Sequence, residues 1–115
     1  MVFSDLAEIA QISLLFDFYG GLLKDRQKEI MSLYHEENLT IVEIANELNI
    51  TKQGVHESLK KSEKLLYSYE EELGLIDKFL LTKEKLEDIL KIVNQLDITE
   101  DNKNEIRRII DTIED

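Results

Sequence analysis

Apolar residues recur at intervals of three or four positions along most of this chain, and polar residues fill the positions between them. That spacing is typical of amphipathic helices, and no stretch alternates residue by residue as a strand would. In the last stretch, Ile106, Ile109, Ile110 and Ile113 keep to this spacing. The pattern predicts an all-α fold with helices over about residues 5–19, 25–34, 41–48, 52–73, 75–96 and from 100 onward.

Capping residues mark the ends of these predicted helices. Three predicted helices are preceded by a residue whose hydroxyl can cap the helix N-terminus: Ser4, Thr40 and Thr51. Thr40 also has the capping-box spacing to Glu43. Residues that tolerate a left-handed backbone follow three of them: Gly20-Gly21, Asn49 and Gly74. The chain has no proline, so long helices are permitted, although the fifth could break near Thr82.

The segment from Ile41 to Leu59 carries the most specific pattern. Ala45 is small enough to let two helices cross closely, and Asn49 can form a left-handed turn between them. Apolar positions on both sides of the turn would lock the pair together: Leu48, Ile50, Val55 and Leu59. We interpret the segment as a helix-turn-helix, with an ordinary helical hairpin as the alternative.

The second helix of this motif would be the recognition helix. Facing away from Val55 and Leu59 are the candidate nucleic-acid-binding residues Thr51, Lys52, Gln53, His56 and Lys60, together with Glu57. Glutamine can pair with both polar atoms of an adenine edge, lysine can donate to guanine or phosphate, and glutamate repels phosphate. The alternative is that these side chains form an ordinary solvated face.

Charge complicates a nucleic-acid role. The formal net charge is −11, whereas DNA-binding domains usually present a basic surface. Locally the balance changes, because four lysines stand against two glutamates between Lys52 and Lys64. We therefore expect weak intrinsic affinity, dependence on dimerisation, or a partner other than DNA.

Composition excludes several kinds of site. There is no cysteine, no glycine-rich phosphate loop, and no pair of histidines at metal-ligand spacing. We expect no catalytic residue, metal or cofactor, and hence a protein that is not an enzyme. The N-terminus lacks a signal-peptide pattern and no apolar run could span a bilayer, which predicts a cytoplasmic protein without membrane insertion.

An apolar first helix and a long apolar stripe near the C-terminus suggest a homodimer. A dimer would place two recognition helices at a fixed spacing, as paired half-sites require. Leu86, Val93 and Leu96 are the candidate interface residues. They could equally pack against the first helix of the same chain.

Four motifs resemble the YlxM family of small bacterial helix-turn-helix proteins. They are Leu14-Leu15-Phe16-Asp17-Phe18-Tyr19-Gly20, Leu22-Leu23 followed by Arg26-Gln27, Glu43-Ile44-Ala45, and Lys52-Gln53-Gly54-Val55-His56. The resemblance implies an all-α fold containing a helix-turn-helix of the sigma-factor region-four type with flanking helices. This chain departs from the family at Lys24, where a capping Thr or Ser is usual, and at Gly54, where alanine is expected.

The resemblance also implies a function. YlxM genes commonly accompany the gene of the signal recognition particle GTPase, which implies a DNA-binding regulator in protein targeting. DNA is favoured over RNA because A-form grooves admit a recognition helix poorly. The alternative is an adaptor or modulator of that GTPase or its RNA. We expect one helical domain over 1–115, with the helix-turn-helix module at 24–73 and C-terminal helices at 74–115.

Overall fold

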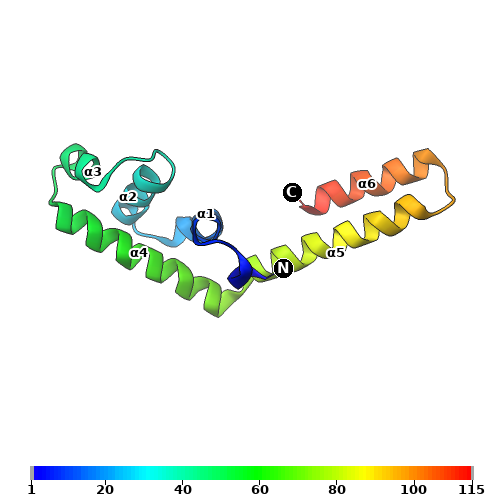
Figure 1. Cartoon of the computed structure of the whole chain (residues 1–115), viewed down its shortest axis with the longest axis horizontal. Coiled ribbons are helices and arrows are strands. Elements are labelled where there is room, and N and C mark those ends of the chain that lie inside the picture. Colours follow the sequence, from blue (N-terminus) through cyan, green and yellow to red (C-terminus); the bar gives the residue numbers. More distant parts are fainter. Residues whose placement is uncertain (1, 115) are drawn as a thin grey trace. The chain divides into compact units, whose positions relative to one another are not determined.

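The computed structural model describes residues 2–114, and within them every regular element is a helix (Figure 1). The α-helices are α1 (Glu8–Tyr19), α2 (Asp25–His35), α3 (Ile41–Leu48), α4 (Lys52–Leu73), α5 (Leu75–Gln95) and α6 (Glu100–Glu114). Two short 3-10 helices, η1 (Phe3–Asp5) and η2 (Gly20–Leu22), flank α1. The all-α prediction is confirmed.

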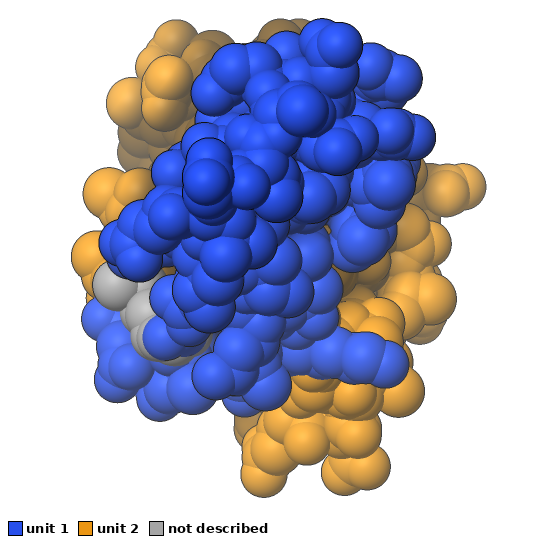
Figure 2. All heavy atoms as spheres, turned by 90° about the vertical axis from the view of Figure 1, so that its right-hand side faces the viewer, with its two compact units in different colours: residues 1–5, 77–115 blue, residues 6–76 orange. Residues whose placement is uncertain are grey.

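The chain divides into two compact units, which are coloured separately in Figure 2. Leu6–Ile76 form the helix-turn-helix unit, and Met1–Asp5 with Asp77–Asp115 form the hairpin unit. The boundary falls three residues after Leu73, the predicted end of the module. The expectation of one domain over the whole chain remains a prediction.

The core of the helix-turn-helix unit is built around α4, which contacts α1, α2 and α3 (Figure 1). Each of the four helices contributes aliphatic side chains to this core, and each such side chain stabilises the fold by about 1.5–3 kcal/mol when fully buried. The most deeply buried of them are Leu15, Ile30, Met31, Ile44, Val55 and Leu66.

Local capping signals set the ends of α3 and α4. The Thr40 hydroxyl accepts from the Glu43 backbone N–H at 3.1 Å, and the Glu43 carboxylate accepts from the Thr40 N–H at 3.1 Å. Asn49 is left-handed at φ 57°, and so is Gly74 at φ 62°. These predicted boundaries are confirmed, and α5 runs through Thr82 without a break.

The predicted start of α1 is wrong. Ser4 lies in η1, and α1 begins only at Glu8, after Ala7. Phe3 is buried, and its backbone N–H donates to the Asp77 carboxylate at 2.7 Å. The first residues therefore pack within the hairpin unit, and that contact keeps them out of α1.

The predicted left-handed glycine cap after α1 is also wrong. Gly20 is right-handed at φ −56°, and the chain continues as η2. A Cβ at Gly20 would lie 3.0 Å from a ring carbon of Phe16. Glycine leaves room there for the aromatic ring and does not supply an unusual backbone angle.

A buried polar cluster joins α1 to the start of α5. The Tyr19 hydroxyl donates to the Glu70 carboxylate at 2.6 Å and accepts from the Leu75 N–H at 3.2 Å. The same Glu70 oxygen accepts from the Ile76 N–H at 2.9 Å. Two of the free N–H groups at the α5 start are thereby satisfied. We call this arrangement the Tyr19–Glu70 clamp.

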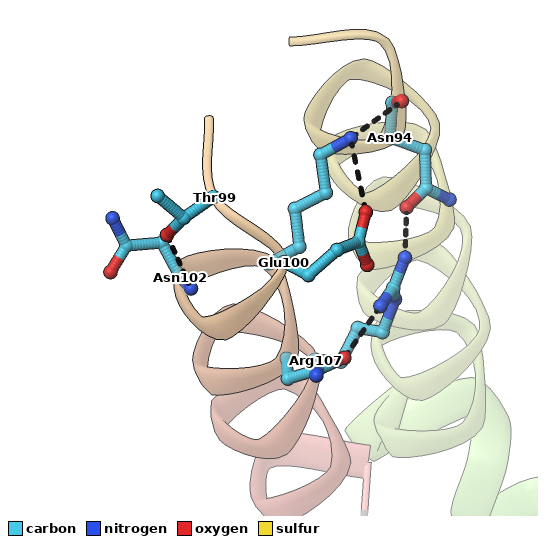
Figure 3. Close-up of polar contacts among 7 residues, drawn as sticks. Asn94, Thr99, Glu100, Asn102 and Arg107 are labelled. Atoms are coloured by element: carbon cyan, nitrogen blue, oxygen red, sulfur yellow. Dashed lines mark hydrogen bonds and ion pairs between the residues drawn. The ribbon is translucent and has the colours of Figure 1, made fainter. Parts of the chain in front are cut away.

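In the hairpin unit, α5 and α6 lie side by side and polar contacts tie their connection together (Figure 3). The Arg107 guanidinium donates to the Asn94 side-chain oxygen at 2.6 Å, and Lys103 donates to the Asn94 carbonyl at 3.3 Å. Both cations therefore lie at the carboxyl end of α5, where the helix dipole favours positive charge. At the start of α6, the Thr99 hydroxyl accepts from the Asn102 N–H at 3.2 Å.

Candidate nucleic-acid interface

The candidate interface rests on the corner between α3 and α4. Ala45 and Val55 are buried in this corner, and Asn49 reverses the chain between the two helices. The N–H of Ile50 donates to the carbonyl of Ala45 at 3.0 Å, which closes the turn. With Leu59 also buried, α4 is held firmly by its inward face.

The outward face of α4 carries every residue predicted to bind nucleic acid. Thr51, Lys52, Gln53, His56 and Lys60 are all exposed, and so is Glu57. This division follows from helix geometry, since the buried Val55 and Leu59 lie one turn apart and fix the inward side. The side chains are accessible to a groove, and their binding role remains a prediction.

Thr51 has two tasks at the start of α4. Its hydroxyl oxygen accepts from the Gly54 N–H at 2.9 Å and so caps the helix. Its own O–H hydrogen is left to donate, and a phosphate oxygen is a suitable acceptor.

Gly54 has a packing role that the sequence alone did not show. A Cβ at this position would lie 3.1 Å from the Thr51 hydroxyl oxygen, closer than an ordinary van der Waals contact. Alanine, although a better helix former, would require the Thr51 hydroxyl to shift by a few tenths of an ångström. Glycine at position 54, where the family pattern has alanine, leaves this space open beside the Thr51 cap.

Gln53 is engaged within its own helix. Its side-chain N–H donates to the Glu57 carboxylate at 3.2 Å, one turn further along α4. Reading a base would require this hydrogen bond to break. The spacing of four residues is typical of such pairs and could have predicted the contact from the sequence.

Positive charge continues beyond the recognition residues. Lys61 and Lys64 are exposed further along α4, while Lys24 and Lys28 at the start of α2 are exposed beside the carboxylates of Asp25 and Glu29. No ion pair neutralises Lys52 or Lys60 among the residues that the structure describes. The interface is thus mildly cationic on a chain of net charge −11.

The three predicted dimer residues have different environments. Leu86 and Val93 are buried within the single chain, while Leu96 is 47% exposed. Of the three, only Leu96 offers a large apolar surface to a second copy. The homodimer itself remains a prediction.

Residues 2–114 contain neither a metal-binding cluster nor a helix that could span a membrane. Within that range no three His, Cys, Asp or Glu side chains come together in a way that could hold a metal ion. No helix in the same range is both long enough and apolar enough to cross a bilayer.

Comparison with known proteins places this chain in a family. The family model described as "Putative helix-turn-helix protein, YlxM / p13 like" matches residues 6–110. A UPF0122 protein of Desulforamulus reducens is 41% identical over 92 residues, covering 80% of this chain and 76% of the relative. One from Acetivibrio thermocellus is 42% identical over 92 residues, covering 80% of this chain and 79% of the relative.

A third relative extends the similarity to nearly the full length. A UPF0122 protein of Bacillus cereus is 33% identical over 109 residues, covering 95% of this chain and 96% of the relative. The resemblance drawn from the sequence motifs is confirmed. With its helix-turn-helix corner and these matches, the chain belongs to the UPF0122 family of YlxM/p13-like helix-turn-helix proteins.

Proposed function

We propose that this protein is a regulator that binds duplex DNA through the outward face of α4, in the manner of a sigma-factor region-four module. The observation that carries the proposal is the division of α4. Val55 and Leu59 are buried in a firm corner, while Lys52, Gln53 and Lys60 are exposed on the opposite side. Such a helix can enter a major groove without any rearrangement of the core.

Each outward residue has a role suited to its chemistry. Gln53 pairs with an adenine edge, and Lys52 donates to guanine or to a phosphate. Thr51 and Lys60 contact the backbone, and His56 lies between them at the groove. Glu57 opposes binding, because it repels phosphate and holds the Gln53 side chain.

The salt dependence of binding tests this assignment. Two phosphates neutralised by Lys52 and Lys60 would give a slope near −1.8 on logarithmic axes, or about 12-fold weaker binding at 200 mM than at 50 mM salt. Labelled duplex DNA would be titrated by fluorescence anisotropy at both concentrations. Affinity that does not change with salt contradicts phosphate contacts.

Paired variants locate the interface. Lys52→Glu with Lys60→Glu should weaken DNA binding at least 100-fold, because two attractive contacts become repulsive. Lys83→Glu with Lys91→Glu changes the charge equally at exposed positions of α5 and serves as the control. Equal losses in both pairs would show that overall charge, not α4, governs binding.

Removing the opposing carboxylate should have the reverse effect. Glu57→Gln keeps a hydrogen-bonding partner for Gln53 but removes the negative charge beside it. We expect binding to tighten about three- to tenfold, as expected for one like-charge contact removed from a phosphate surface. Unchanged affinity would place Glu57 outside the interface.

Dimerisation through the hairpin unit belongs to the same proposal. Besides Leu96, the exposed aliphatic residues of this unit include Ile92, Ile109 and Ile113, each at least half exposed. A second copy could bury this apolar stripe, and the resulting dimer would carry two α4 helices. Binding through both helices would compensate for the small number of positive charges on each one. Light scattering at micromolar concentration should give a dimer, and Ile92→Glu with Ile109→Glu should give a monomer.

The connection with protein targeting is proposed from the YlxM resemblance. It predicts that the protein acts alongside the signal recognition particle, in a soluble cytoplasmic setting. The anisotropy titration would be repeated with signal recognition particle RNA. Tighter binding to that RNA than to any duplex DNA, with the same loss in Lys52→Glu/Lys60→Glu, would replace DNA by RNA as the target.

A further inference from the structure

A long apolar trough crosses the helix-turn-helix unit away from the predicted DNA-binding residues. It consists of two hollows of about 420 Å³ and 660 Å³, which share Ile9, Tyr34 and His35 as lining residues. The first lies among α1, α2 and α4, and the second extends over the connection between α2 and α3. None of Thr51 to Lys60 lines either hollow.

Several apolar side chains along the trough are exposed to solvent. Ile9 is 87% exposed although it lies in a regular turn of α1. Val42 is 46% exposed and Tyr34 is 36% exposed along the same trough. Single apolar residues at a surface are ordinary, but several gathered around a hollow are typical of an interaction site.

Carboxylates dominate the charged groups around the first hollow, where His35 is the single basic side chain in the lining. Its rim carries the carboxylates Glu8, Asp17, Glu36 and Glu63, and the Glu63 carboxylate lies 3.2 Å from the His35 imidazole nitrogen. No lysine or arginine lines either hollow, and Lys28 lines only a smaller adjoining one. Such a rim repels phosphate and attracts cations, so it suits a positively charged occupant with apolar anchors.

We propose that the trough is a docking site for a basic amphipathic helix of a partner protein. Apolar residues on one face of that helix would cover Ile9 and Tyr34, and lysine or arginine residues beside them would face the carboxylates. Helices are recognised in this way through anchors three or four residues apart, laid into an apolar groove. The proposal adds a protein-binding surface to the proposed DNA-binding face and does not depend on it.

A model peptide provides the probe. A fluorescein-labelled, 14-residue amphipathic helix of leucine and lysine would be titrated with the full chain and followed by anisotropy. A peptide with glutamate in place of lysine is the charge-reversed control. We expect the lysine peptide to bind at least tenfold more tightly. Equal binding of the two peptides, or no binding of the lysine peptide, overturns the proposal.

Matched variants at exposed positions locate the binding. Ile9→Lys should weaken peptide binding at least tenfold, because it places a charge in the centre of the trough. Leu22→Lys makes the same change at a residue that is 59% exposed and lines neither hollow, and should alter binding less than twofold. Equal effects of Ile9→Lys and Leu22→Lys would show that the peptide is attracted only by the overall negative charge of the protein. That result would contradict a binding site in the trough.

The acidic rim is tested separately. Glu8→Gln with Glu36→Gln should weaken binding about three- to tenfold at low salt and less at high salt. Glutamine at position 36 can still accept the hydrogen bond that Ser32 donates at 2.7 Å, so the local structure should be kept. Glu47→Gln with Glu72→Gln, at exposed positions away from the trough, is the control.

Two further results would assign the trough to another occupant. If Ile9→Lys changes the self-association of the protein in sedimentation, a second copy covers the trough. If Ile9→Lys weakens the binding of duplex DNA to the protein, nucleic acid covers it. Either result overturns the proposal, whereas unchanged self-association and DNA binding in Ile9→Lys support a separate protein-binding surface.

Discussion

The Tyr19–Glu70 clamp makes a quantitative prediction about stability. Tyr19→Phe removes one hydroxyl and almost no volume, so the packing of the ring should be preserved. The lost hydrogen bond to the Glu70 carboxylate, at 2.6 Å, is of a kind worth about 1.5–3 kcal/mol. The Leu75 N–H also loses its acceptor, but Leu75 is 46% exposed, so water can replace it.

We therefore expect Tyr19→Phe to lower the free energy of unfolding by about 2 kcal/mol. The loss would be measured by urea titration with circular dichroism as the signal. The midpoint of unfolding should fall, while the dependence of the unfolding free energy on urea concentration stays the same. Tyr69→Phe is the matched control, because its ring centre lies 6.0 Å from that of Tyr19 and no hydrogen bond of its hydroxyl is found in the described structure. A loss below about 0.5 kcal/mol, or one equal to that of Tyr69→Phe, would refute the reasoning.

The effect of Tyr19→Phe on stability should depend on pH. Burial, followed by the hydrogen bond to Glu70, raises the pKa of Tyr19 above 10.0. Below pH 10 Tyr19 keeps its hydroxyl proton in both the folded and the unfolded chain. The hydroxyl then makes its full contribution to the free energy of unfolding. Above pH 10 the unfolded chain loses the proton first, and stability falls as pH rises. The stability difference between wild type and Tyr19→Phe should therefore shrink above pH 10.

Three other changes test smaller features. Ser62→Ala should stabilise the fold by about 1 kcal/mol in urea titration, because the buried Ser62 hydroxyl has no hydrogen-bond partner in residues 2–114. Thr51→Ala should destabilise α4 by about 1 kcal/mol through loss of its cap, and a variant as stable as wild type would contradict that role. Arg107→Ala should lower the melting temperature of the hairpin unit by a few degrees, since it removes the 2.6 Å bond to Asn94.

Helix boundaries that depend on neighbouring residues could be predicted from the sequence. The start and end of α3 follow from Thr40, Glu43 and Asn49, whose contacts reach no further than a turn. The start of α1 could not be predicted, because it depends on a bond between Phe3 and Asp77, which are 74 residues apart. Ser4 has the right chemistry for a cap, but this distant contact decides its conformation.

The same distinction applies to the candidate sites. The outward face of α4 could be predicted, since the period of a helix places Gln53 and Lys60 opposite Val55. The trough could not, because Ile9, Tyr34 and Val42 come together only when three helices pack. Leu86 and Val93 belong to an apolar stripe in the sequence, which cannot tell burial within a hairpin from burial in a dimer.

Short connections between the helices have a consequence for folding kinetics. Five residues join α2 to α3, three join α3 to α4, and Gly74 alone joins α4 to α5. Partners that are close along the chain meet quickly, so helical proteins of this kind refold within microseconds to milliseconds. Because the chain has no proline, stopped-flow refolding should show no slow isomerisation phase lasting tens of seconds.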